Sequence, residues 1–327
     1  MTPAPPHVVA DGRPAEGRHA GRIARIDWAP LRPRAGWLWR RLHHKRWHYV
    51  GLAHEQVFIG VAIVDVGWTA TAFAYLFDRR ERRLLADWSQ DGLPSLQAGV
   101  SDEPLAGAHT WFHGPGARLR LQHQAGDTLA LTVHSRALRL EANLALGAMA
   151  PPLLAIGRVD GGLAHATQKT SALPVHGWAE AQGRRFALDG GWAAVDASNG
   201  LLARDTAWLW ASAHGPGVGF NLQQGYFGEQ ENVLWLDGRP VALGAARFVF
   251  DAAQPLQPWR VSTDDGLLDL VFTPEGARTQ DRDLGFAASH YVQPIGSFTG
   301  QVRAAADAPP RAVVALAGVT EDHRSRW

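Results

Sequence analysis

The amino-acid sequence predicts an all-β protein made of antiparallel strands, and three observations support this class. Short apolar runs of strand length follow one another along most of the chain, several with a polar residue at every second position. The joins at residues 53–56 and 66–68 are of hairpin size, which leaves no room for crossover helices. No helix-length segment is amphipathic, so we expect an up-and-down sheet.

The first group of strands is expected within residues 35–150. Residues 1–34 are rich in Pro, Gly and Arg, which predicts an irregular lead-in along the surface. After it, RLRLQH at 118–123 and LRLEANL at 138–144 alternate apolar with polar residues, as half-buried strands do. The expected strands of this part are 47–53, 57–65, 69–78, 83–88, 118–123, 129–135 and 138–144.

The strand rhythm breaks at residues 148–152 and then resumes within residues 151–327. Roughly 14 or more strands with such a break indicate two sandwiches or barrels, and barrels of about eight strands hold one ligand in their mouths. Only residues 81–87 and a short stretch near Ala304 have any helical character. The expected strands are 153–158, 175–180, 185–188, 206–211, 218–222, 233–236, 246–250, 259–262, 268–272, 300–303 and 312–319.

Composition restricts the chemistry and the compartment. Hydrophobic residues make up 46% of the chain and the net charge is +1, so the protein is globular and has no overall field for nucleic acid. The absence of cysteine excludes disulfides, thiolate catalysis and cysteine-based zinc sites. No apolar run reaches the length of about 18 residues that a membrane span needs, and residues 1–25 lack a signal-peptide core. We expect a cytoplasmic protein without nucleic-acid partners or stable membrane insertion, and the oligomeric state is open.

The basic residues show two local features. WLWRRLHHKRW at 37–47 is basic and aromatic; it suits either phosphates and an anionic membrane surface or, our preferred interpretation, tryptophans that pack on a barrel. Lysine occurs only at Lys45 and Lys169, whereas the other 30 basic residues are Arg. A retained lysine in such a chain suggests a role for a compact ammonium or a titratable amine.

Six segments, taken in order, resemble a known family. The segments are HKRWHYVGL at 44–52, QKTSALPVHGWAE at 168–180, DGGWAAVDASNG at 189–200, WLWASAHGPGVGFNLQQG at 208–225, ENVLWLDG at 231–238 and GVTEDHRSRW at 318–327. From residue 35 to the C-terminus they resemble the uncharacterised bacterial and fungal family DUF2804. The resemblance implies a relation to the double-lipocalin group, which includes carotenoid hydratases, cyclases and Diels–Alderases. It therefore implies two lipocalin-like, calycin-like antiparallel β-barrels packed into one body, with domains at 35–150 and 151–327, but it carries over no catalytic residue.

Four residues are candidates for acid–base catalysis: Asp196, Glu231, Lys169 and His176. A buried Lys169 beside His176 would supply an acid or base with a lowered pKa, or would pair with Asp196. Asp196 lies among small residues and needs such a partner if it is buried. Glu231 follows a polar loop at 223–230 and would serve as an acid or base. For each of them the alternative is structural, as an ion pair or a capped polar loop.

The substrate-binding candidates are mostly aromatic: Asn221, Tyr226, Trp178, Trp208, Trp210 and Trp235. Aromatic walls suit isoprenoid chains, through cation–π stabilisation, and sugar faces, through stacking, although core filling is the default for most tryptophans. Asp189 is assigned to a hairpin turn, and Glu321, Asp322 and His323 are assigned a structural role. The histidines show no metal-binding spacing, so no metal is expected.

Three functions are compatible with these residues. The first is a cofactor-independent hydratase, isomerase or cyclase that acts on a small hydrophobic, isoprenoid or lipid-like molecule in a Trp-lined cavity. The second is a non-catalytic lipid or pigment carrier, and the third is a glycoside-active enzyme that uses two carboxylates. No nucleophile elbow, phosphate loop or dinucleotide fingerprint lies at a strand-to-helix turn, which argues against hydrolases, kinases and dehydrogenases.

Overall fold

The computed structural model describes residues 1–283 and 287–327. Within these ranges the chain forms strands β1 to β27, a single α-helix, α1 (Trp37–His43), and two short 3-10 helices, η1 (Ala29–Leu31) and η2 (Leu146–Ala148). The chain is therefore mostly β, which confirms the coarse class that the sequence predicts. The finer division into two lipocalin-like barrels, with a boundary at residue 150, stays a prediction.

The first sheet has 16 strands and divides at β18. Strand β18 pairs with β15, with β5 along its whole length and with the start of β16. One branch runs from β5 through β6 and β7 to β8, and the other runs from β16 through β13 to β9. The strands are β1 (Thr2–Pro3), β4 (Gly17–Ala20), β5 (His44–Ala53), β6 (Val57–Asp65), β7 (Ala70–Asp78), β8 (Arg83–Gly92), β9 (Ala98–Gly99), β10 (His109–Gly114), β11 (Ala117–Gln124), β12 (Thr128–His134), β13 (Arg139–Ala145), β14 (Leu153–Gly157), β15 (Ala164–Lys169), β16 (Leu173–Ala181), β17 (Arg184–Ala187) and β18 (Trp192–Leu201).

The second sheet has nine strands in the order β22-β21-β20-β19-β27-β26-β25-β24-β23. The change from the first sheet to the second falls between β18 and β19. The strands are β19 (Asp205–Gly215), β20 (Val218–Gly225), β21 (Val233–Leu236), β22 (Arg239–Ala242), β23 (Ala246–Val249), β24 (Trp259–Thr263), β25 (Leu268–Asp283), β26 (Ala288–Val302) and β27 (Arg311–Arg326), and a separate hairpin joins β2 (Val9–Ala10) to β3 (Arg13–Pro14).

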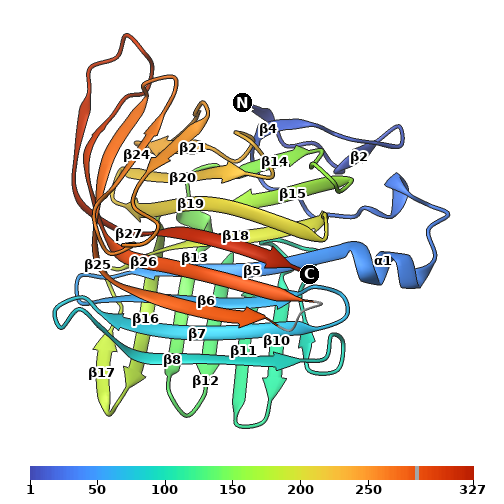
Figure 1. Cartoon of the computed structure of the whole chain (residues 1–327), viewed down its shortest axis with the longest axis horizontal. Helices are drawn as coiled ribbons and strands as arrows, with labels where there is room; N and C mark the ends of the chain where they lie inside the picture. The colour runs from blue at the N-terminus through green and yellow to red at the C-terminus, as the bar shows by residue number, and fades with distance from the viewer. Residues whose placement is uncertain (284–286) are drawn as a thin grey trace.

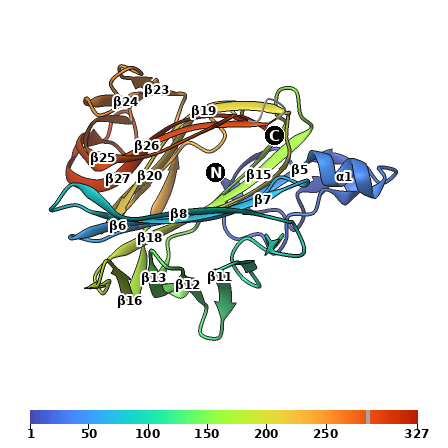
Figure 2. The same cartoon turned by 60° about the horizontal axis from the view of Figure 1, so that its bottom comes forward.

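Strands β5 to β8 form a middle layer, with strands of the other branch on one face and the second sheet on the other (Figures 1 and 2). On the first face, Ile59 and Leu76 belong to the large core that includes Leu119 and Leu131. On the opposite face, Tyr75 and other aromatic residues pack against strands β19, β26 and β27. Because β6 is buried on both faces, its sequence is continuously apolar instead of alternating.

The edges of the two sheets meet along a ladder of side chains between β8 and β25. Arg278 Nε donates to Asp87 Oδ1 at 2.9 Å, Gln280 Nε2 to Ser89 Oγ at 3.4 Å and Arg282 Nη1 to Asp91 Oδ2 at 2.7 Å. We call these six residues the side-chain seam. The contacts join every second residue of β8 to every second residue of β25. They close the space between the sheets, although no backbone hydrogen bonds pair β8 with β25 in the described part of the chain.

The N-terminal lead-in is more than a surface segment, so that expectation is wrong. Strand β4 adds to the edge of the first sheet at β14, and Ile23, Ile26 and Trp28 are buried. The amide N–H of Ile23 donates to Gln168 Oε1 at 3.0 Å. The lead-in therefore contributes to the core beside β15.

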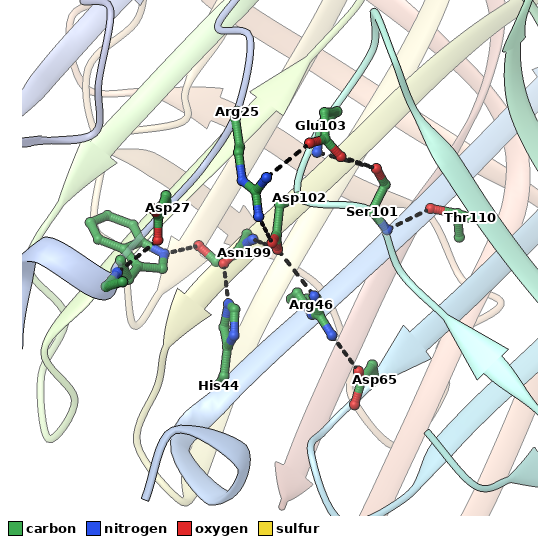
Figure 3. A network of polar contacts seen from close by, with 12 residues as sticks. Arg25, Asp27, His44, Arg46, Asp65, Ser101, Asp102, Glu103, Thr110 and Asn199 are labelled. Atoms are coloured by element: carbon green, nitrogen blue, oxygen red, sulfur yellow. Dashed lines mark hydrogen bonds and ion pairs between the residues drawn. The ribbon is translucent and has the colours of Figure 1, made fainter. Parts of the chain in front are cut away.

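A polar network around Asp102 holds the lead-in against the sheet (Figure 3). The Asp102 carboxylate accepts hydrogen bonds from Arg25 at 3.2 Å, Arg46 at 3.1 Å and Asn199 at 3.1 Å. Arg46 also donates to Asp65 at 2.7 Å. The network thus joins the lead-in, β5, β6 and β18.

Helix α1 arises from the basic aromatic segment and was not predicted. Its C-terminal end is fixed by Lys45, whose buried ammonium donates to Leu42 O at 2.6 Å and to Val66 O at 2.8 Å. Trp37 is 76% exposed, so the expectation that the tryptophans of this segment pack on a barrel is wrong for this residue. Residues 83–87, the main part of the expected helical stretch, instead begin β8. No helix in the described ranges is long and apolar enough to span a bilayer.

Protonation of His214 is expected to destabilise the fold in acid. His214 is buried between the hydroxyls of Ser171, at 2.9 Å, and Ser212, at 2.7 Å, and burial lowers its pKa to about 3. Below pH 6.5 the unfolded chain binds a proton at this residue while the folded chain does not, so the free energy of unfolding falls with pH, by about 1.4 kcal/mol per pH unit. The free energy of unfolding, measured with urea at several pH values between 4 and 7, should have a shallower slope against pH in His214→Gln than in the wild-type protein. Substitution of the exposed His7 by Gln should leave the slope unchanged, and an unaltered slope in His214→Gln would contradict this assignment.

Candidate functional site

A buried lysine lies between two carboxylates at the junction of the two sheets. Lys169 Nζ is 2.6 Å from Asp196 Oδ2 and 2.7 Å from Glu231 Oε2. Lys169 and Asp196 come from the first sheet, whereas Glu231 precedes β21 of the second. Lys169 is 4% exposed and Glu231 is 3% exposed. We call these three residues the buried ion triplet, and it ties one sheet to the other.

The division of the first sheet places Lys169 and Asp196 opposite each other. Lys169 is the last residue of β15 and is in register with Asp196 on β18. The chain then bends through Ala172, which has a φ of +47°, and enters the other branch as β16. The Asp196 carboxylate also accepts a hydrogen bond from Ser198 Oγ at 2.8 Å. The site therefore lies where the sheet splits.

Amide side chains fix the loop that carries Glu231. Asn221 Nδ2 donates to Glu231 O at 2.9 Å, and Trp210 Nε1 donates to Asn221 Oδ1 at 2.8 Å. Asn232 accepts from the backbone N–H of Gln223 at 2.7 Å. These bonds hold the loop between β20 and β21, so that Glu231 reaches across to Lys169.

The charges of the triplet favour one proton on Glu231. Two carboxylates and one ammonium leave an excess negative charge in a buried place, which is costly. Burial raises the pKa of Glu231 and outweighs the opposite effect of Lys169. Burial lowers the pKa of Lys169, but Asp196 and Glu231 outweigh it, so the net shift is upward. Lys169 thus stays charged while Glu231 is the group that takes up a proton.

The triplet forms part of the wall of an aromatic cavity of about 100 Å³. The cavity lies between the middle layer and the second sheet. Trp208 is held by a hydrogen bond from its Nε1 to Glu321 Oε1 at 2.8 Å, and it stacks on Trp47 with ring centres 6.4 Å apart. The wall consists of Trp47, Tyr49, Ala62, Val64, Phe73, Lys169, Asp196, Trp208, Trp210, Gln223, Tyr226, Glu231, Tyr291, Glu321, His323 and Trp327.

Several buried polar atoms of this wall have no hydrogen-bond partner among the described residues. They are Tyr49 OH, Tyr291 OH and both amide atoms of Gln223. A buried polar group without a partner costs about 1–3 kcal/mol, so such groups are rare in native cores. Their position around one cavity makes them available to the oxygen atoms of a ligand or to water.

Glu321 and His323 also line the cavity, although the sequence analysis assigned them a structural role. Glu321 accepts from Gln293 Nε2 at 2.9 Å, and Gln293 accepts from Tyr75 OH at 2.5 Å. His323 Nδ1 is 3.4 Å from Glu321 Oε1. Residues 321 and 323 lie on one face of β27. Because side chains two positions apart in a strand point to the same side, the sequence already indicated that these two residues would lie together.

The structure brings most of the predicted site residues together. Lys169, Asp196, Trp208, Trp210, Tyr226 and Glu231 line the cavity, and Asn221 contacts Glu231.

Three predicted residues lie elsewhere. His176 is exposed and pairs with Asp189, which lies in a turn as expected. Trp178 stacks under Arg185, and Trp235 is a core residue whose Nε1 donates to Pro151 O at 2.9 Å. In the described part of the chain, no three His, Asp or Glu residues are grouped so that they could hold a metal ion.

Removal of the ammonium should destabilise the protein strongly. In Lys169→Met, the buried Glu231 and the partly buried Asp196, whose side chain is 14% exposed, would lose their counter-charge, a change that costs about 3–5 kcal/mol. Urea denaturation should also show partial recovery in the double variant with Glu231→Gln, because one of the two carboxylates is then neutral. The exposed pair Arg80–Glu55, at 3.5 Å, provides a control: Arg80→Met should cost less than about 1 kcal/mol. Equal losses in the two single variants would contradict the role of the triplet.

The comparisons with known proteins give a family and a shared fold. The chain matches solved structures of kievitone hydratase from Nectria haematococca, with a TM-score of 0.55, 9% identity, and coverage of 88% of this chain and 90% of that one. It also matches CghA, with a TM-score of 0.61, 11% identity, and coverage of 99% and 97%. A structure of CghA with Sch210972 matches with a TM-score of 0.56, 10% identity, and coverage of 86% and 88%. No curated protein matches the chain. Residues 4–327 match the family described as "Domain of unknown function (DUF2804)", and the chain belongs to this family.

Proposed function

We propose that this protein is a cofactor-independent enzyme of the hydratase, isomerase or cyclase kind that acts on a small hydrophobic molecule. The observation that carries the proposal is the buried ion triplet, which forms part of the wall of an aromatic cavity. Binding of an apolar ligand does not require ionisable groups, and the burial of three of them is costly. Acid–base chemistry gives them a use.

Glu231 is the proposed acid. In its protonated form it transfers the proton to one carbon of an alkene, which leaves a cation on the neighbouring carbon and a carboxylate on Glu231. In a hydration, water then adds to the cation and its excess proton returns to Glu231. In an isomerisation, the cation instead loses a different proton to the Glu231 carboxylate, which restores the acid. The raised pKa of Glu231 keeps the acid form populated closer to neutral pH than an exposed glutamate would allow.

The other residues position and stabilise the reacting groups. Lys169 holds Asp196 and Glu231 in place through contacts of 2.6 and 2.7 Å. The rings of Trp208 and Trp210 are fixed by hydrogen bonds from their indole N–H groups, so that their faces can stabilise a cation.

The structural neighbours support the same class. One of them is named a hydratase, and another was solved with the small molecule Sch210972. The shared fold fits the proposed relation to double-lipocalin enzymes. Hydrolysis of glycosides by two carboxylates ranks lower, because Lys169 lies between Asp196 and Glu231, where a glycosidic bond would have to fit.

Proton transfer is tested by deuterium uptake. The protein is incubated in D2O with a panel of isoprenoid alkenes and polyenes, and mass spectrometry detects gain of deuterium or of D2O. Uptake should fall by about 10²–10⁴-fold in Glu231→Gln, since the proton donor is lost. Asp189→Asn, which changes an exposed turn carboxylate, is the control and should retain full uptake.

The outcomes separate an enzyme from a carrier. Full uptake by Glu231→Gln would overturn the assignment of the acid. A hydrophobic molecule that co-purifies with the protein and returns from D2O unchanged would indicate the carrier function instead.

A further inference from the structure

A second chamber of about 220 Å³ adjoins the cavity between the two sheets. The two spaces share Val64, Phe73, Tyr291, His323 and Trp327 in their walls. The outer chamber also contains residues of the side-chain seam, Arg278 among them. A ligand that fills both spaces would therefore have one end at the triplet and the other end near Arg278.

Arg278 is unusual because it is a buried cation with few partners. It is 2% exposed, and its guanidinium carbon lies 4.3 Å from the centre of the Phe73 ring and 5.4 Å from that of Tyr291. Its Nε donates to Asp87, whose side chain is 38% exposed. Its Nη1 has no hydrogen-bond partner among residues 1–283 and 287–327. A guanidinium has five N–H donors, so one carboxylate leaves part of its capacity unused.

The seam alone does not explain this arrangement. Arg282, four residues further along β25, makes a similar contact with Asp91 at 2.7 Å, but its side chain is 43% exposed, so water can satisfy its other donors. Arg278 is closed off from solvent by aromatic rings and faces the outer chamber instead. Desolvation of a cation is costly, so a further acceptor is expected beside it.

Among the described residues, the wall of the outer chamber contains three arginines, Arg278, Arg282 and Arg326, and one acidic side chain, Asp91. Asp91 is bound by Arg282, and Arg326 binds Asp205, which lies outside the chamber wall. Arg278 is thus the cation of this wall with a buried donor to spare.

We infer that the outer chamber binds an acidic oxygen group of the ligand, a carboxylate or an enolate, with Arg278 Nη1 and Tyr291 OH as the donors. The apolar part of the same molecule extends into the cavity toward the triplet. This inference rests on the proposed function and narrows its substrate class to hydrophobic acids. Tyr291 suits the role because burial raises its pKa, so its hydroxyl keeps the proton that it donates.

Fluorescence titration with cis-parinaric acid, a polyene fatty acid, and with its methyl ester tests the inference. The two probes share the chain and differ at the carboxyl group, which is charged in the acid and neutral and one methyl group larger in the ester. The wild-type protein should bind the acid at least about 10-fold more tightly than the ester, because hydrogen bonds between charged groups are stronger than those to a neutral ester. In Arg278→Met the affinity for the acid should fall to that for the ester, while the affinity for the ester is unchanged. Arg260→Met, which removes an exposed guanidinium paired with Asp269 at 2.9 Å outside both spaces, is the control and should keep the preference for the acid.

A second variant guards against an unfolded Arg278→Met protein. Tyr291→Phe removes one donor without the charge, so it should weaken binding of the acid several-fold while binding of the ester is unchanged, and thermal unfolding checks that the variant folds. Equal affinity of the wild-type protein for acid and ester would overturn the inference. Preference for the acid in a folded Arg278→Met would overturn it as well.

The readout is binding of the probe and not proton transfer, so this test is separate from that of the proposed function. Glu231→Gln should retain the full preference for the acid. If deuterium uptake depends on Glu231 but acid and ester bind equally, the proposed function stands and only the inference of an acidic group on the ligand is wrong.

Discussion

The structure depends on one constraint: the Lys169 ammonium must reach two carboxylates that belong to different sheets. A buried charge is tolerated only when its partners are held at contact distance, so this requirement fixes the separation of the sheets at one point. On the side of the first sheet, the register between β15 and β18 meets it, and on the other side Asn221 and Asn232 hold the Glu231 loop. The cavity lies beside that contact. Its walls are aromatic because the face of the middle layer that packs against the second sheet carries aromatic side chains.

Much of the fold could be predicted because many strands carry their pattern locally. The continuous apolar run of β6 and the alternation of β11 indicate their strands without help from the rest of the chain. Strand β18 was not predicted: its sequence, WAAVDASNGL, consists mostly of small and polar residues, and it is held by three neighbouring strands, of which β5 comes from a distant part of the chain. Strand β15 is wholly buried although it contains His, Gln and Lys, which no rule of periodicity anticipates.

The candidate site was only partly predictable for the same reason. The scarcity of lysine drew attention to Lys169, and the need of a buried Asp196 for a partner suggested their pairing. His176 is near Lys169 in sequence, but the bend between β15 and β16 carries it to the surface. Arg278 depends on rings and a carboxylate that the sequence separates from it by long stretches, so its burial could not be inferred.

The burial of both lysines has a consequence for the chemistry of the surface. Lys45 is 3% exposed and Lys169 is 4% exposed, so every lysine side chain of the protein is withdrawn from solvent, while the positively charged side chains at the surface are arginines. Acetylation and ubiquitination require an accessible lysine amine, and neither lysine presents one in the folded state. Because the charge of an arginine is not removed by lysine acetylation, the folded protein keeps its surface charge wherever lysine-modifying enzymes act.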